Sequence, residues 1–313
     1  MKHAFILTAY RDPESLKRFI GQLLNIQDSQ IYCCIDRKSE SMAAEILAWV
    51  QSEAKTDSRF NNIRIIHDQV IRYASTDHLN VQMRLIKEAI NDGADYCHTL
   101  TGQCRLIVTP QFFTQFFDLH EGQNFIEIFK LPASHWSGDG GLNRIQYFQL
   151  YDVLDIKRWG PIFDISNRFL LLCQRLLKLD RRRNYPYKTD AFWGGLGYWS
   201  LHKDALKAIV SDPILSQAHQ SSLYKHSHCA EEFIIHTVLM NSAYGKENES
   251  KILANHLRFM DWGIGHGESP AILDENHLPQ IEQGKENEYP YLFARKFDSR
   301  YSTKLENRLT SNI

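Results

Sequence analysis

The chain has 313 residues and a formal net charge of −1, with 43% hydrophobic and 23% charged residues. This composition is ordinary for a globular protein with a sizeable core, and the balanced charge gives no electrostatic reason to expect a nucleic-acid partner. No apolar run reaches membrane-spanning length and the first residues do not form a secretory signal, so we expect a cytoplasmic protein with reduced cysteines.

The first hundred residues alternate strand-like and helix-like segments, with strands expected at residues 4–9, 31–35, 63–66 and 96–100. The helix after the first strand has a typical start signal, with Asp12 as N-cap and Pro13 at its first position. A β-α-β-α-β series predicts a mostly parallel sheet covered by helices on both faces. The predicted fold class is therefore α/β, with a Rossmann-like sheet.

In sheets of this kind, ligands bind at the carboxyl ends of the strands. The first strand ends near Thr8, and the second is followed by Asp36 and Lys38. The fourth strand runs into Thr101 and Gly102. We therefore expect Thr8, Asp36, Lys38 and Gly102 to lie in loops that face a nucleotide.

The pattern changes from about residue 125, where a strand is expected over residues 125–129. Residues 165–179 form a strongly apolar helical pattern that runs into three consecutive arginines at 181–183. An amphipathic helix beside a basic cluster can lie on an anionic membrane surface. A core helix and a contact between subunits, as in a homodimer, are the alternatives, and the sequence leaves these interpretations of residues 165–183 open.

Two adjacent acids, Glu231 and Glu232, open a segment whose apolar residues recur at helical spacing over residues 233–239. We therefore expect both acids in the first turn of a helix, where the macrodipole and free backbone N–H groups favour the ionised carboxylate. An ionised carboxylate suits a base that takes a proton from a hydroxyl. Simple capping of the helix is the alternative, and His228 and His236 are less favoured bases.

Several familiar motifs are absent from the sequence: a GxGxxG after a strand, a P-loop, G-x-S-x-G, H-E-x-x-H and C-x-x-C. An Asp-x-Asp pair, which usually holds a manganese-bound diphosphate in sugar-nucleotide enzymes, is missing as well. A diphosphate leaving group would then have to be neutralised by cationic side chains. Arg295 and Lys296, flanked by aromatic residues, are the candidates, with solvated surface as the alternative.

Seven segments taken in order resemble the core-2/I-branching β-1,6-N-acetylglucosaminyltransferase family, which includes peptide xylosyltransferases, and its bacterial branch in particular. The segments are residues 5–10, 35–39, 100–103, 194–201, 231–233, 257–262 and 292–298. The resemblance implies one GT-A-like domain over residues 1–313. Its nucleotide-binding half covers about residues 1–125, its acceptor and catalytic half about 126–300, and its tail 301–313.

The resemblance implies an inverting, metal-independent enzyme without a cofactor. It would transfer a sugar, with GlcNAc favoured, from a UDP-sugar to a hydroxyl of an oligosaccharide or lipid-linked glycan acceptor. The reaction would belong to bacterial surface-polysaccharide synthesis. The family's catalytic base matches Glu232 and its diphosphate-binding lysine matches Lys296. Acceptor-binding positions match Glu127, Trp262 and, with different spacing, Arg144.

Two positions depart from the family pattern. Cys104 stands where the family usually has Asp, and Glu268 aligns near a second diphosphate-binding Arg of animal members, a role left to Arg295 or Arg258. Both departures concern the donor, so two alternatives stay open. One is a transferase for UDP-xylose or another UDP-sugar, and the other is a catalytically silent glycan-binding protein.

Overall fold

The computed structural model describes residues 1–188, 191–216 and 224–311 of the chain. Across these residues the central sheet has seven strands, in the order β10 (Ile252–Leu253), β6 (Asn124–Ile126), β9 (Trp199–His202), β4 (Tyr96–Thr101), β1 (His3–Ala9), β2 (Ser29–Ile35) and β3 (Ile63–Ile66). Strand β9 is antiparallel to both of its neighbours, and all other pairs in this sheet are parallel. The predicted α/β fold with a mostly parallel sheet is confirmed.

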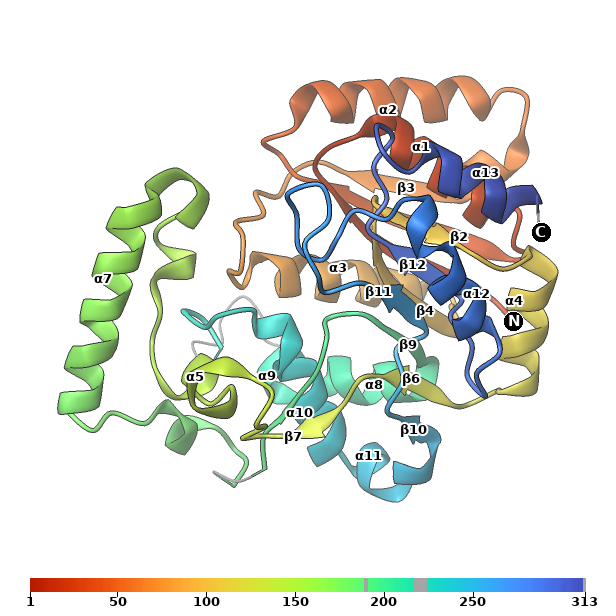
Figure 1. The fold of residues 1–313 in the computed structure, drawn as a ribbon. Helices are drawn as coiled ribbons and strands as arrows, with labels where there is room; N and C mark the ends of the chain where they lie inside the picture. Colours follow the sequence, from red (N-terminus) through yellow and green to blue (C-terminus); the bar gives the residue numbers. More distant parts are fainter. Residues whose placement is uncertain (189–190, 217–223, 312–313) are drawn as a thin grey trace.

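Helices cover both faces of the sheet, as the strand–helix alternation predicts (Figure 1). Successive side chains of a strand point to opposite faces, so Ala4 and Ile6 of β1 enter one core while Phe5 and Leu7 enter the other. The helices over the first core are α3 (Asp77–Asn91), α8 (Lys203–Ser211) and α10 (Ile234–Asn241). Those over the second are α1 (Pro13–Leu24), α2 (Glu40–Glu53) and α4 (Pro110–Leu119).

The turn between β1 and α1 forms as its sequence predicts. The Asp12 carboxylate accepts a hydrogen bond from the backbone N–H of Ser15 at 3.0 Å, and Pro13 is the first helical residue. Asp12 has a left-handed φ of 57°, so the chain reverses sharply after β1. This reversal leaves Tyr10 and Arg11 at the carboxyl end of β1.

A second, three-stranded sheet joins the segment after β4 to the C-terminal part of the chain. It contains β5 (Cys104–Leu106), β12 (Phe293–Arg295) and β11 (Arg258–Met260), with β12 in the middle. The backbone N–H of Phe297 donates to the carbonyl of Gln103 at 2.8 Å. The sheet therefore delivers Arg295 and Lys296 to the loop that follows β4.

The remaining helices and strands lie mainly in the second half of the chain. Residues in the predicted tail form α13 (Thr303–Ser311), whose Leu305 and Leu309 are buried. The predicted strand at 125–129 is split into β6 and β7, and Glu127 lies between them. The other elements are β7 (Phe129–Lys130), α5 (Ser137–Gly140), α6 (Asn143–Gln146), β8 (Trp193–Gly194), α9 (Pro213–Ser216), α11 (Ala243–Glu247) and α12 (Leu278–Lys285).

Helix α7 (Ile156–Leu176) stands apart from the body of the protein (Figure 1). It has a break at Gly160, which precedes Pro161 and has a positive φ of 33°. Beyond the break, Ile165 and Phe169 are 71% and 67% exposed. The reading of this segment as a core helix is therefore wrong, because its apolar side faces solvent.

No helix among the described residues combines the length and apolar character that crossing a membrane requires.

Candidate active site

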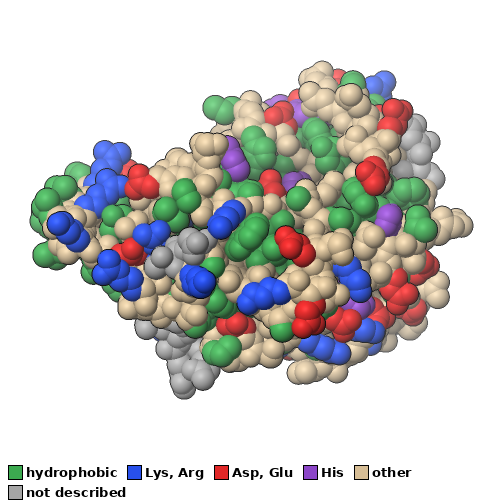
Figure 2. All heavy atoms as spheres, turned by 90° about the horizontal axis from the view of Figure 1, so that it is seen from below, with side chains coloured by type: hydrophobic (Ala, Val, Ile, Leu, Met, Phe, Trp, Pro, Cys, Tyr) green, Lys and Arg blue, Asp and Glu red, His purple; other side chains and the backbone are tan. Residues whose placement is uncertain are grey.

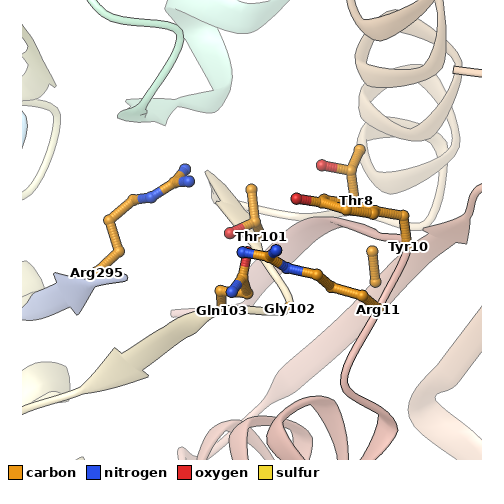
Figure 3. Close-up of a pocket in the computed structure, with 8 residues that line it drawn as sticks. Thr8, Tyr10, Arg11, Thr101, Gly102, Gln103 and Arg295 are labelled. Carbon is orange, nitrogen blue, oxygen red and sulfur yellow. The ribbon is translucent and has the colours of Figure 1, made fainter. Parts of the chain in front are cut away.

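A pocket opens at the carboxyl ends of β1 and β4, where the strand order predicts ligand binding. Its empty volume is about 340 Å³. The residues that line it are Thr8, Ala9, Tyr10, Arg11, Thr101, Gly102, Gln103 and Arg295 (Figure 3). Of the residues predicted to bind the donor, the structure thus places Thr8, Gly102 and Arg295 on one pocket.

Gly102 has a packing reason to be glycine. Its backbone N–H donates to the carbonyl of Thr8 at 3.0 Å, which holds the loop against β1. A Cβ at this position would lie 3.1 Å from the Cβ of Ala9 and 3.3 Å from a methyl group of Leu16. The missing side chain therefore lets the two strand ends approach closely.

Arg295 brings a buried cation to the pocket. The side chain is only 8% exposed, and its guanidinium lies 4.7 Å from the ring centre of Tyr198. Its Nε and Nη1 atoms have no hydrogen-bond partner among the described residues, and burial lowers its pKa. Figure 3 shows Arg11 and Arg295 extending from opposite sides toward the same space. Unsatisfied donors of this kind favour an anionic ligand.

Glu268 lies between two further cations of the site. Its carboxylate accepts hydrogen bonds from Arg11 at 2.6 Å and from Lys296 Nζ at 2.7 Å. The hydrogen bond from Arg11, with a further contribution from Lys296, lowers the pKa of Glu268 to about 2. Burial lowers the pKa of Lys296, which is 7% exposed. Glu268, which aligns near a family arginine, is thus an anion that pairs with the two cations beside the pocket.

The acid pair does not lie in the first turn of an α-helix, so that prediction is wrong. Glu231 and Glu232 lie in a 3-10 turn, Ala230–Glu232, and Phe233, with φ −140°, separates this turn from α10. The reason is Cys229, which has a positive φ of 50° and whose N–H donates to the carbonyl of Ala74 at 2.8 Å. This contact pulls the turn toward the loop before α3.

The expected stabilisation of the ionised form is also wrong for Glu232. Burial raises the pKa of Glu232 to about 7, although its neighbour Arg144 acts in the opposite direction. Arg144 forms an ion pair with Glu232, and its guanidinium lies 4.1 Å from the ring centre of Trp136. A carboxylate with this pKa and this partner can exchange a proton near neutral pH.

A histidine that the sequence did not single out connects the acid pair to the pocket. His78 Nδ1 lies 3.1 Å from Glu231 Oε1, and its Nε2 lies 3.2 Å from the hydroxyl of Thr8. The residue sits near the start of α3, where the sequence shows only an ordinary helix. Only the folded chain reveals that the acid pair and the strand end lie close together.

Asp36 and Lys38 are not part of this pocket. The Asp36 carboxylate accepts hydrogen bonds from the backbone N–H groups of Lys38 at 3.0 Å and Ile71 at 3.4 Å. Lys38 Nζ in turn donates to the carbonyl of Ile71 at 3.1 Å. These two residues tie the loop after β2 to the segment before α3.

The predicted acceptor residues lie on separate elements. Glu127 accepts a hydrogen bond from the backbone N–H of Leu196 at 3.0 Å, and burial raises its pKa. Trp262 is 59% exposed and lies in the same loop as Glu268, whose backbone pairs with Gly265. Arg144 contacts Glu232 itself, so it lies beside the predicted base.

Arg258 and Cys104 have structural roles. Arg258 is 1% exposed and donates to Ser200 Oγ and the carbonyl of Trp199, so it cannot serve a diphosphate in the pocket. Cys104 is fully buried, and its sulfur accepts a hydrogen bond from the backbone N–H of Thr101 at 3.4 Å. Burial lowers the pKa of His228 to about 4 and that of His236 to about 3.

Within residues 1–188, 191–216 and 224–311, no group of three or more His, Cys, Asp or Glu side chains is placed to hold a metal ion.

No protein-family model matches the chain, and no curated protein matches it in sequence. Solved structures do resemble it. One is residues 1–349 of TarS from S. aureus, with 9% identity, a TM-score of 0.39, and coverage of 80% of this chain and 57% of that one. Another is mouse xyloside xylosyltransferase 1, with 10% identity, a TM-score of 0.36, and coverage of 96% and 98%. A third is 4-diphosphocytidyl-2C-methyl-D-erythritol synthase from Anaerococcus prevotii, with 13% identity, a TM-score of 0.32, and coverage of 71% and 84%. With TM-scores this low, none of these likenesses identifies a reaction or a family.

Proposed function

We propose that the protein is an inverting, metal-independent glycosyltransferase that moves a sugar from a UDP-sugar to a hydroxyl of a glycan acceptor. One observation carries this proposal. Arg11 and Arg295 line a pocket at the strand ends, and Lys296 adjoins it. The acid pair is linked to the same pocket through His78 and Thr8. These contacts support a role for the cations in binding a leaving diphosphate, and they link Glu231, the neighbour of the proposed base Glu232, to the same pocket.

In the proposed reaction, Glu232 takes the proton of the acceptor hydroxyl. The oxygen attacks the anomeric carbon from the face opposite the leaving group, a new glycosidic bond forms, and the bond to UDP breaks. Negative charge then grows on the diphosphate, where Lys296, Arg295 and Arg11 would stabilise it. The acceptor hydroxyl would lie beside Glu232, and the exposed ring of Trp262, in the loop of Glu268, would offer an apolar face to a sugar.

The donor is tested by thermal unfolding in EDTA with a panel of UDP-sugars. The family resemblance favours UDP-GlcNAc, with UDP-xylose as the alternative donor. The true donor should stabilise the protein by about 2.7 kcal/mol over the ligand-free protein at a concentration near 100 times its Kd, and by more than UDP at the same concentration. Stabilisation that appears only after manganese is added would contradict the metal-independent proposal.

The pH dependence of transfer tests the role of Arg144. Because Glu232 must lose its proton to act as a base, and its pKa is about 7, the turnover rate should rise with pH through about 7. Arg144 lowers this pKa, so Arg144→Gln should move the acidic limb of the pH–rate profile to higher pH. If the acidic limb of the pH–rate profile does not move and only the KM for the acceptor rises, Arg144 binds the acceptor and does not lower the pKa of Glu232.

A catalytically silent glycan-binding protein is the second candidate, and the position of Glu268 favours it. This carboxylate already binds Arg11 and Lys296, the cations that a diphosphate would need. Measuring UDP release from the stabilising UDP-sugar, with and without a panel of soluble glycosides, separates the two candidates. A transferase releases UDP faster with an acceptor, whereas a silent protein releases none.

A further inference from the structure

Helix α7 is turned with its apolar side away from the body of the protein. The apolar stripe comprises Ile162, Ile165, Phe169, Leu172 and Leu176, whose exposed fractions are 56%, 71%, 67%, 54% and 74%. Their spacing of three and four residues places them on one side of the helix, over a length of roughly 20 Å at 1.5 Å per residue. A contiguous exposed stripe of this size is unusual on a free protein surface.

Polar side chains hold the helix in this orientation. Asn167 and Gln174 are buried on the side that faces the body. The Asn167 side-chain oxygen accepts from the N–H of Leu150 at 3.0 Å. Gln174 accepts from the N–H of Phe148 at 2.7 Å and donates to the carbonyl of the same residue at 2.8 Å. These hydrogen bonds fix which side is buried, so the exposure of the apolar stripe is built into the fold.

Positive charge lies at both ends of the apolar stripe and along one of its edges. The exposed cations on α7 and just after it are Lys157, Arg158, Arg168, Arg175, Lys178 and Arg183. Asp164 is the exposed acid within the helix, and Arg175 lies 3.4 Å from Asp139 of α5. Figure 2 shows hydrophobic side chains at the end of the projecting lobe, with Lys and Arg gathered beside them. Because the whole chain has a net charge of −1, this positive charge is local to the lobe.

We propose that the apolar stripe of α7 docks on a bilayer surface that contains anionic lipids. Apolar side chains on one side of a helix, with cations along one edge and at both ends, match the acyl chains and the negative headgroups at such an interface. A second copy of the chain is the less suitable occupant, because pairing two α7 helices would bring like-charged edges together. The proposal goes beyond glycosyl transfer and does not depend on it.

Vesicle sedimentation with the full chain tests this docking. The protein should bind vesicles of phosphatidylcholine mixed with phosphatidylglycerol, bind phosphatidylcholine alone far less, and lose binding as salt screens the headgroups. Phe169→Glu should weaken binding by about tenfold or more, and Ile165→Glu/Phe169→Glu should remove it. Leu119→Glu is the matched control, because Leu119 is 80% exposed at the end of α4, away from α7 (Figure 1).

Two results would overturn the proposal. The first is wild-type protein that stays in the supernatant with anionic vesicles, or that binds neutral vesicles equally well. The second is self-association, measured by analytical ultracentrifugation, that Phe169→Glu abolishes while vesicle binding is absent. Turnover of a soluble acceptor should be unchanged in Phe169→Glu, since the apolar stripe contributes no residue to the pocket.

Discussion

Replacing Glu232 by Gln is expected to abolish sugar transfer, with a loss on the order of 10²- to 10⁴-fold in turnover, the usual effect of removing a general base. Glutamine keeps the shape of the side chain and an oxygen that can accept a hydrogen bond from Arg144. It cannot take the proton of an acceptor hydroxyl. The initial rate of UDP release in the presence of acceptor measures the effect, and Glu249→Gln, on an exposed glutamate, is the matched control.

The fold of the Glu232→Gln protein should be intact. Burial raises the pKa of Glu232 to about 7 from its ordinary 4.5, so the folded state resists ionisation of this group. Its contribution to the free energy of unfolding therefore falls as pH rises from about 4.5 to about 7. Glutamine removes this penalty, and the variant should be at least as stable as the wild type at pH 8. Full transfer activity in this variant would remove Glu232 from the mechanism.

Glu268→Gln and Lys296→Ala are expected to change UDP affinity in opposite directions. Glu268 binds both Arg11 and Lys296, so a diphosphate must compete with its carboxylate. Removing the negative charge should strengthen UDP binding by about tenfold, which corresponds to about 1.4 kcal/mol. Lys296→Ala removes a charged hydrogen-bond donor and should weaken UDP binding by about 10- to 100-fold, with a fall in turnover.

Isothermal titration of UDP in EDTA measures both changes, and Glu286→Gln, at an exposed position, is the matched control. The pKa of Glu268 is about 2, so its charge is constant between pH 5 and pH 9, and the titrations of wild type and variant are compared at one pH above 8, where the UDP phosphate is fully ionised. Weaker UDP binding in Glu268→Gln would mean that the carboxylate positions the two cations and does not compete with the ligand.

Local signals predicted the first half of the chain well. The Asp12 cap, the buried strands and the pocket at their carboxyl ends follow from residues close together in sequence. The acid pair shows where such signals fail. The apolar spacing after Glu232 is helical, but the positive φ of Cys229 and the extended φ of Phe233 make the preceding turn a 3-10 turn. The backbone N–H of Cys229 bonds to the carbonyl of Ala74, far away in the sequence, so no local signal could reveal this conformation.

The charge pairing in the site could not be predicted from the sequence. Arg11 and Glu268 are 257 residues apart, and they meet only because β12 inserts between β5 and β11. His78 of α3 likewise contacts Glu231, 153 residues away, and only the folded chain brings them together. The sequence also could not predict which side of α7 faces solvent, because an amphipathic pattern defines two sides of a helix without showing which one packs against the protein. Asn167 and Gln174 decide it through hydrogen bonds to residues 148–150.

A crystal structure with UDP-GlcNAc bound in the presence of EDTA tests the central claim most directly. We expect the diphosphate to contact Lys296, Arg295 or Arg11, with Glu268 displaced, and the anomeric carbon to face the Glu232 carboxylate. A donor bound away from the ends of β1 and β4, or an anomeric carbon turned away from Glu232, would contradict it.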